Sequence, residues 1–135
     1  MKRSVLLAYQ WITALSDTLT GALLYLAPTF TLRLMGVHAP PDAIPYISYI
    51  GAFVLSVGLA CLYGAILLVR RAPADRVATV WLLTAISRAA VAIYVLKAVM
   101  SQTLEPAWVP VALFDATCAI IQAVGLRKRW LVDAH

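Results

Sequence analysis

Four long apolar stretches dominate the sequence and constrain its fold more than any other feature. They cover approximately residues 5–27, 46–69, 77–100 and 107–126. Each is about 20 to 24 residues long, which at about 1.5 Å rise per residue crosses a hydrocarbon core of about 30 Å. Hairpins of helices buried in a soluble protein would be shorter and more amphipathic. The stretches therefore predict an all-α polytopic membrane protein, a bundle of four transmembrane helices.

Composition and length agree with one membrane domain. Hydrophobic residues make up 63% of the chain and charged residues 13%, against roughly 25% charged residues in an ordinary soluble domain. With 135 residues, we expect residues 1–135 to form a single four-helix transmembrane domain, without room for a soluble catalytic domain. Pro28 and Gly36 bracket residues 29–36, which predicts a short helix that lies at the membrane interface.

Basic residues predict the orientation, because Lys and Arg accumulate in loops that stay in the cytoplasm. Eight of them fall on one side of the predicted bundle: Lys2, Arg3, Arg70, Arg71, Arg76, Arg127, Lys128 and Arg129. We therefore expect both termini to be cytoplasmic, in a multi-pass protein of the bacterial cytoplasmic (inner) membrane. The first stretch is too long for a secretory signal and no small-x-small cleavage site follows it, so it is predicted to be retained. Topology and anionic headgroups account for the net charge of +5, and no nucleic acid partner is expected.

Three ionisable residues lie deep inside the apolar stretches: Asp17, Arg88 and Asp115. Counted from the basic edges of their helices they lie 12, 11 and 11 residues in, which is about 16 to 18 Å at the helical rise. This depth places all three near the centre of the bilayer. A charge there costs at least about 2.5 to 3.5 kcal/mol, so intramembrane ions are candidate functional residues.

Each of these ions shares a helix face with small or polar residues. Lipid offers no hydrogen-bond partners, so these faces are expected to meet inside the bundle. The predicted ligand- or proton-binding site contains the three ions and three neutral residues on the same faces, Thr13, Thr84 and Gln122.

The charges of this cluster suggest proton chemistry. Arg88 stays protonated and can hold one aspartate ionised through a bidentate pair. The second aspartate adds a negative charge at low dielectric, and like charges disfavour joint ionisation. We therefore expect the cluster to carry one exchangeable proton. The alternative is a clasp of Asp17, Arg88 and Asp115 that only fixes the helix register.

Helix packing is predicted on the second stretch, where small residues recur every four positions. Such a stripe permits the close backbone approach on which helix association in lipid depends. Internal packing is favoured over a dimer interface, although the sequence does not separate the two. The predicted packing residues are Ala52, Ser56, Ala60 and Gly64.

Residues for covalent catalysis or metal binding do not stand out. Cys61 and Cys118 lie in different stretches without C-x-x-C spacing, and are interpreted as small buried apolar residues. The sequence contains no Ser-His, His-Glu-His or Cys-His arrangement. We predict no catalytic residues, no metal site and no identified cofactor, and an enzyme is not the favoured class.

The first half of the chain carries a set of glycines, a proline and apolar residues: Gly21, Pro28, Leu32, Leu34, Gly36, Val37, Tyr49, Gly51, Ala52, Gly58 and Leu59. In this set the chain resembles the DoxX-like group of small four-helix bacterial membrane proteins. Members of that group are linked to quinone-dependent oxidoreductase complexes. The resemblance implies a redox accessory or quinone-handling role.

Three functions follow from these observations. The first is an integral membrane binding or accessory protein whose Asp-Arg-Asp site holds a lipophilic small molecule such as a quinone or isoprenoid. The second is a proton-coupled small-molecule transporter that acts as a dimer. The third is a purely structural subunit of a larger membrane complex. All three place the protein in the lipid bilayer, alone, as a homodimer or with other membrane proteins.

Overall fold

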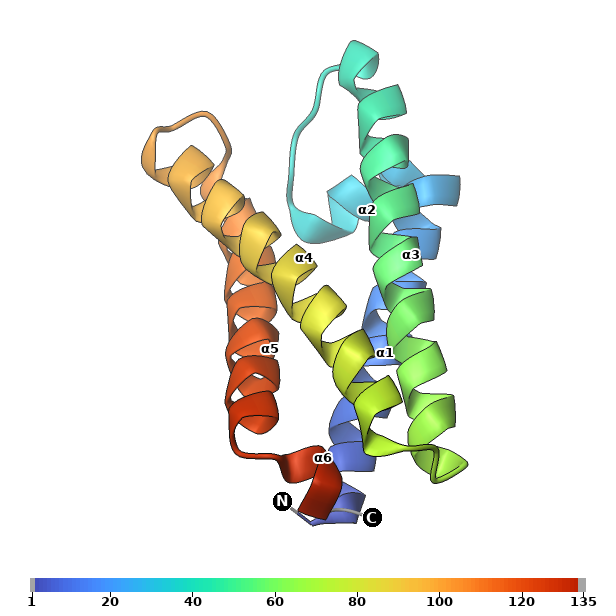
Figure 1. The fold of residues 1–135 in the computed structure, drawn as a ribbon. Coiled ribbons are helices and arrows are strands. Elements are labelled where there is room, and N and C mark those ends of the chain that lie inside the picture. Colours follow the sequence, from blue (N-terminus) through green and yellow to red (C-terminus); the bar gives the residue numbers. More distant parts are fainter. Residues whose placement is uncertain (1, 134–135) are drawn as a thin grey trace.

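The computed structural model describes residues 2–133, and this part of the chain is helical without strands. Figure 1 shows its order of elements. The helices are α1 (Arg3–Leu26), α2 (Pro28–Met35), α3 (Ile44–Val69), α4 (Ala74–Met100), α5 (Val109–Arg127) and α6 (Trp130–Asp133), with 3-10 turns η1 (Pro41–Ala43) and η2 (Pro106–Trp108). The predicted all-helical fold is confirmed, and the four long helices begin and end within a few residues of the predicted stretches.

Three segments in the described part of the chain are long and apolar enough to cross a membrane. They are Pro41–Val69, Ala74–Met100 and Pro106–Arg127, so that η1 and η2 extend α3 and α5. α1 has 24 residues, a length between the 22 and 29 residues of the shortest and longest of these segments. It is less apolar, because it contains residues such as Gln10, Thr13 and Asp17, all of which are buried in the structure.

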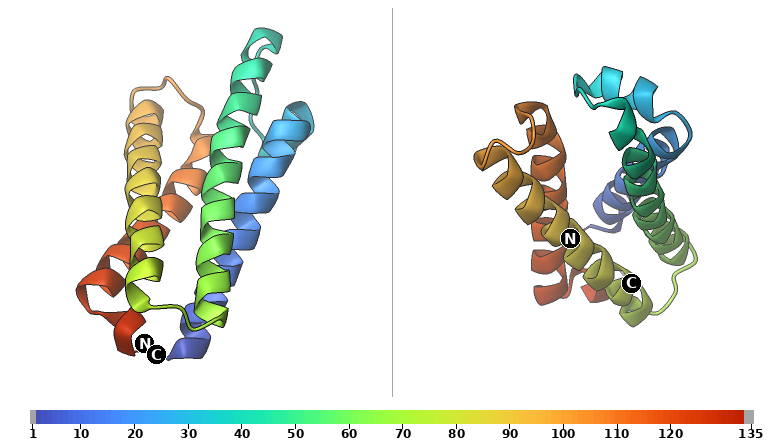
Figure 2. Two further views of the ribbon diagram at one scale, coloured as in Figure 1. Left: turned by 45° about the vertical axis from the view of Figure 1, so that its right-hand side comes forward. Right: turned by 90° about the horizontal axis from the view of Figure 1, so that it is seen from above.

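The long helices form two pairs, as the two views in Figure 2 show. α1 packs along α3, and α4 packs along α5. Glycines bring α1 and α3 together, since a Cβ on Gly21 would collide with the backbone of Leu55 and a Cβ on Gly58 with that of Thr18. Their missing side chains permit the close backbone contact that stabilises helix pairs in lipid.

This contact runs along a different line from the predicted packing stripe. Of the four stripe residues, only Gly64 is buried; Ala60 is half-buried, and Ala52 and Ser56 are exposed. Within one chain Ala52 and Ser56 do not pack internally, and a packing role for these two residues stays a prediction. The contact follows the glycines, which turns the alanine and serine side chains away from α1.

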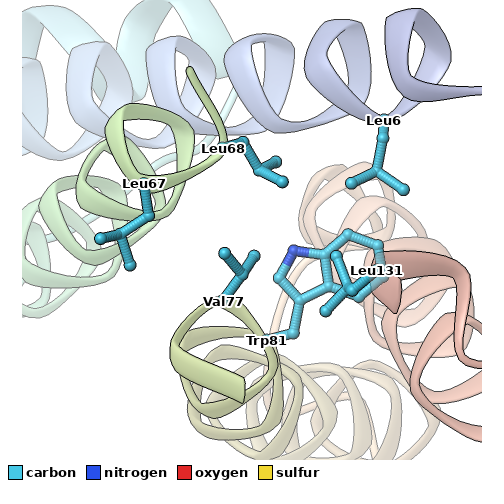
Figure 3. Packing of buried hydrophobic residues seen from close by; sticks show 6 residues of the cluster. All are labelled: Leu6, Leu67, Leu68, Val77, Trp81 and Leu131. Carbon is cyan, nitrogen blue, oxygen red and sulfur yellow. The ribbon is translucent and has the colours of Figure 1, made fainter. Parts of the chain in front are cut away.

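One end of the bundle carries the eight basic residues that the orientation prediction used, and we call it the basic end. α1 begins there, α3 turns into α4 there, and α5 ends there beside α6 (Figure 1). An apolar cluster closes this end and joins α1, α3, α4 and α6 through Leu6, Leu67, Leu68, Val77, Trp81 and Leu131 (Figure 3). Arg3 also donates from Nη2 to the carbonyl oxygen of Leu68 at 3.0 Å, which caps the end of α3.

The opposite end holds the short helix α2. Pro28 occupies its first turn, and Gly36 ends it in the left-handed region with a φ of 69°, as expected for a proline start and a glycine stop. Thr31 and Leu32 are buried, whereas Phe30 is exposed. The helix predicted for residues 29–36 is confirmed, and its exposed apolar side chains suit the interfacial position expected from the sequence.

Candidate functional site

The guanidinium of Arg88 lies between Asp17, which is buried, and Asp115, which is half-buried. It comes from the middle of α4, and the residue is 2% exposed. Its Nη2 donates to Oδ2 of Asp17 on α1, and its Nη1 donates to Oδ1 of Asp115 on α5 at 2.8 Å. The structure thus brings together the three ions that the depth count placed at one level. One buried guanidinium forms two ion pairs with acids on separate helices.

This arrangement connects the two helix pairs. Asp17 belongs to the pair α1 and α3, whereas Arg88 and Asp115 belong to the pair α4 and α5. The charge cluster crosses from one pair to the other at the middle of the bundle, and the Tyr9 hydroxyl, which donates to the carbonyl oxygen of Cys118 at 3.3 Å, also crosses between the pairs. Removing a charge here therefore affects how the two pairs are held together.

The two acids differ in their surroundings. The Asp17 side chain is 10% exposed and that of Asp115 is 16% exposed. The Phe114 ring lies beside the cluster, with its centroid 5.4 Å from Cζ of Arg88, at a distance where a cation and an aromatic face attract. Asp115 is therefore the more accessible acid, next to an aromatic side chain that is itself partly exposed.

Polar atoms of the cluster keep unused bonding capacity. Within residues 2–133, three buried side-chain atoms have no hydrogen-bond partner: Nε of Arg88, Oε1 of Gln122 and Oγ1 of Thr18. Each aspartate uses one carboxylate oxygen for Arg88. Buried polar groups of native proteins are nearly always bonded, and each exception calls for an explanation. A donor on the arginine and acceptors on its neighbours are available to a further group.

The neutral residues predicted for the site form bonds of their own. Gln122 Nε2 donates to Oγ1 of Thr84 at 2.9 Å, which ties α5 to α4 next to the cluster. The Thr13 hydroxyl donates to the carbonyl oxygen of Tyr9, 3.1 Å away in its own helix. All three residues are buried as predicted. They lie around the ions, and the structure shows no hydrogen bond from them to a charged atom.

Gln10 organises a second polar network that sequence reasoning did not assign to the site. Its Oε1 accepts from Nε1 of Trp81 at 2.7 Å, and its Nε2 donates to the carbonyl oxygen of Cys61 at 2.8 Å. One fully buried amide thus links α1, α3 and α4. The edge of the Tyr9 ring packs on Trp81, with ring centroids 5.6 Å apart. The available signal was a glutamine two turns before Asp17 in an apolar stretch.

Comparison with protein family models, with curated proteins and with solved structures found no match. Function is therefore inferred from the chemistry of the site.

Two cysteines lie near the charge cluster. Cys61 and Cys118 are both free and buried, in helices on opposite sides of Arg88. Among the described residues, no three His, Cys, Asp or Glu side chains are grouped so that they could hold a metal ion. The groups of the site that can bind a ligand are one guanidinium, two carboxylates, and amides and hydroxyls that form hydrogen bonds.

Proposed function

We propose that this protein binds the polar head of a lipophilic small molecule at Asp17, Arg88 and Asp115, within the membrane. The observation that carries the proposal is the unused Nε of Arg88, which lies fully buried in the same guanidinium whose Nη1 is bonded to the more accessible carboxylate of Asp115. A clasp that served only to hold helices would gain by bonding every buried donor. An unused donor next to a carboxylate instead offers a complementary pair of bonds to a ligand.

The unused donor of Arg88 and the free acceptor of Asp115 together define the ligand class. A carbonyl or hydroxyl oxygen can accept from Nε of Arg88, while a hydroxyl can donate to the free oxygen of Asp115. A quinol meets both needs on one ring with an apolar tail, because each of its hydroxyl groups can accept and donate, whereas the oxidised quinone offers only the carbonyl acceptor. The Phe114 ring supplies an aromatic neighbour. The resemblance to the DoxX-like group, which implies the role of a quinone-linked redox accessory protein, supports the same class of ligand.

The proposal includes the topology. All four long helices cross the bacterial inner membrane, with both termini in the cytoplasm. α1 crosses although it is less apolar than the other three, because its polar residues face the bundle and not the lipid: Gln10, Thr13 and Asp17 are buried. Because eight basic residues lie at one end of the bundle, we expect that end to face the cytoplasm.

Titration of decylubiquinol, kept reduced, into the purified protein in lipid nanodiscs tests the proposal. Arg88→Lys keeps the positive charge but removes the Nε donor, and Asp115→Asn removes the acceptor charge. Because a hydrogen bond to a charged group is worth about 1.5 to 3 kcal/mol, each change is expected to weaken binding by about tenfold to a hundredfold.

Asp42→Asn is the matched control, because Asp42 lies exposed in η1 at the end opposite to the basic one. It is expected to leave the affinity unchanged. Equal affinity of the wild type, Arg88→Lys and Asp115→Asn would exclude binding at this site, and would favour a purely structural subunit.

A second candidate function is a proton-coupled transporter that acts as a dimer. Its support is the ion pair of Arg88 with Asp17, which joins the two helix pairs, so that uptake of a proton by Asp17 would loosen the contact between the pairs. Exposed Ala52 and Ser56 offer a small-residue surface to a second copy. Proton uptake into proteoliposomes that depends on an added substrate, and that is lost in Asp17→Asn, would favour this function over static binding.

A further inference from the structure

A hollow lies at the basic end, separate from the charge cluster. It is bounded by the first turn of α4, the last turn of α5 and the short helix α6, and has a volume of about 270 Å³. Most of its lining is apolar, including Ala78, Leu126 and Val132. Figure 1 shows these three elements meeting at the edge of the bundle. In a membrane-embedded chain this edge lies at the level of the lipid headgroups.

Two side chains of opposite charge line this hollow. Asp75 comes from the first turn of α4, and Arg129 from the bend between α5 and α6. In the part of the chain that the structure describes, neither forms a salt bridge with the other or with a third residue. An acid and a base that flank one apolar hollow without pairing present a zwitterionic surface to whatever enters it.

The backbone holds Arg129 in place. Its φ is 54°, in the left-handed region that residues other than glycine seldom adopt and that costs about 1 to 2 kcal/mol. Its amide donates to the carbonyl oxygen of Leu126 at 3.2 Å, and its own carbonyl accepts from the amide of Val132 at 3.0 Å. The bend therefore determines where the Arg129 side chain branches from the backbone, which is at the rim of the hollow.

The wall of the hollow is also well packed. A Cβ on Gly125 would lie 2.8 Å from the Trp130 ring and closer still to the Trp81 ring. The glycine lets both indoles pack directly on α5, and Trp81 is fully buried. A rigid aromatic backing suits a preformed binding site at a membrane edge.

We propose that this hollow binds one phosphatidylethanolamine molecule of the surrounding bilayer. Arg129 contacts the lipid phosphate, Asp75 accepts hydrogen bonds from the ammonium group, and the apolar lining takes the glycerol region and the upper part of an acyl chain. The hollow is too small for a whole lipid, so the remaining chains stay in the bilayer. This site goes beyond the proposed function and shares with it only the assumption that the protein is embedded in a membrane.

Charge complementarity selects this headgroup over the common alternatives. Phosphatidylglycerol has the phosphate but no cation, so Asp75 repels it. Phosphatidylcholine has the same charges, but its quaternary ammonium has no N–H to donate. A primary ammonium is the group that both neutralises and hydrogen-bonds a carboxylate.

Native mass spectrometry of the full chain tests the site. The protein is released from nanodiscs that contain equal amounts of phosphatidylethanolamine, phosphatidylglycerol and phosphatidylcholine with identical acyl chains. The wild type is expected to retain one phosphatidylethanolamine in preference to the other two. Asp75→Asn should lower retention of phosphatidylethanolamine about threefold, as fits an exposed ion pair, and should raise that of phosphatidylglycerol. Arg129→Gln should lower both.

Three controls make the result specific. Arg127→Gln removes an equal charge from an exposed position outside the hollow and should leave the lipid preference unchanged. Ala78→Leu keeps both charges, narrows the hollow and should reduce phosphatidylethanolamine retention. Soluble glycerophosphoethanolamine, which lacks acyl chains, should not displace the bound lipid.

The proposal is overturned if the wild type retains the three lipids equally, if Asp75→Asn leaves their ratio unchanged, or if Arg127→Gln acts like Arg129→Gln. Displacement by glycerophosphoethanolamine would overturn the lipid as occupant. The altered side chains at positions 75, 127 and 129 are exposed, and ratios are compared within the folded, monodisperse fraction. Quinone binding at Arg88 is measured separately and stands or falls independently of these results.

Discussion

Replacing Arg88 should destabilise the protein far more than replacing either of its acidic partners. Arg88→Gln leaves the carboxylates of Asp17 and Asp115 without a cation in a site where the arginine was 2% exposed. Breaking a buried ion pair by removing one partner costs about 3 to 5 kcal/mol. Asp17→Asn, in contrast, leaves one neutral pair of Arg88 with Asp115 and costs about 1 kcal/mol, the net value of one hydrogen bond.

The triple variant Arg88→Gln, Asp17→Asn, Asp115→Asn separates charge from shape. It keeps polar side chains of similar size but carries no charge, so it should recover most of the stability that Arg88→Gln loses. Lowering the pH should also restore part of the Arg88→Gln stability. Protons that neutralise the two unpaired carboxylates bind the folded state more than the unfolded state, so stability rises as the pH falls.

The measurement is reversible unfolding in mixed micelles, in which the share of a denaturing detergent is raised and helix content is followed by circular dichroism. The free energies of unfolding are compared at neutral pH. The reasoning is refuted if Arg88→Gln costs no more than Asp17→Asn. It is also refuted if the triple variant is no more stable than Arg88→Gln alone.

Three further predictions concern packing, the second polar network and topology. Gly21→Val should lower the free energy of unfolding by about 3 kcal/mol, because its side chain meets the α3 backbone; an unchanged stability would contradict the observed contact. Gln10→Leu leaves the buried indole N–H of Trp81 without an acceptor and should cost about 1 to 3 kcal/mol, with an altered near-ultraviolet circular dichroism spectrum. A cysteine introduced for Ser101, in the turn after α4, should react with a membrane-impermeant maleimide in intact spheroplasts, whereas one introduced for Pro73 should react only after permeabilisation. The reverse pattern would invert the proposed orientation.

Helix positions could be predicted from the sequence because apolar length and charged edges determine them. The stretch predicted at 77–100 is α4 (Ala74–Met100), and that at 107–126 corresponds to α5 (Val109–Arg127) with η2 before it. The short helix α6 was not predicted, since four residues after a basic run carry no periodic signal.

The charge cluster could be predicted because the helical rise converts sequence position into depth. Asp17, Arg88 and Asp115 lie at similar depths, and only polar partners can compensate for their charges in lipid. The sequence could not reveal how the acids share the guanidinium or which of them is more accessible. Those details depend on the rotation of each helix about its own axis.

Helix rotation also explains why Ala52 and Ser56 of the predicted packing stripe are exposed in a single chain. Ala52 and Ser56 are four residues apart and lie on one line along α3. Other residues of α3 with the same spacing lie on neighbouring lines of the same helix. Contact between α1 and α3 uses Gly21 and Gly58, where the absence of both side chains gives the closest approach. Which line of small residues meets a neighbour is decided by the partner's surface, and a single helix sequence does not contain that information.

The most direct test of the proposed function is a mass-spectrometric inventory of small molecules that remain bound after gentle extraction from the native membrane. The wild type is compared with Asp115→Asn and Arg88→Lys, both checked for intact helix content. A lipophilic compound with carbonyl or hydroxyl groups should be present in the wild type and depleted about tenfold or more in both variants. Identical inventories in all three proteins would contradict ligand binding at the cluster and leave Asp17, Arg88 and Asp115 as a clasp between the two helix pairs.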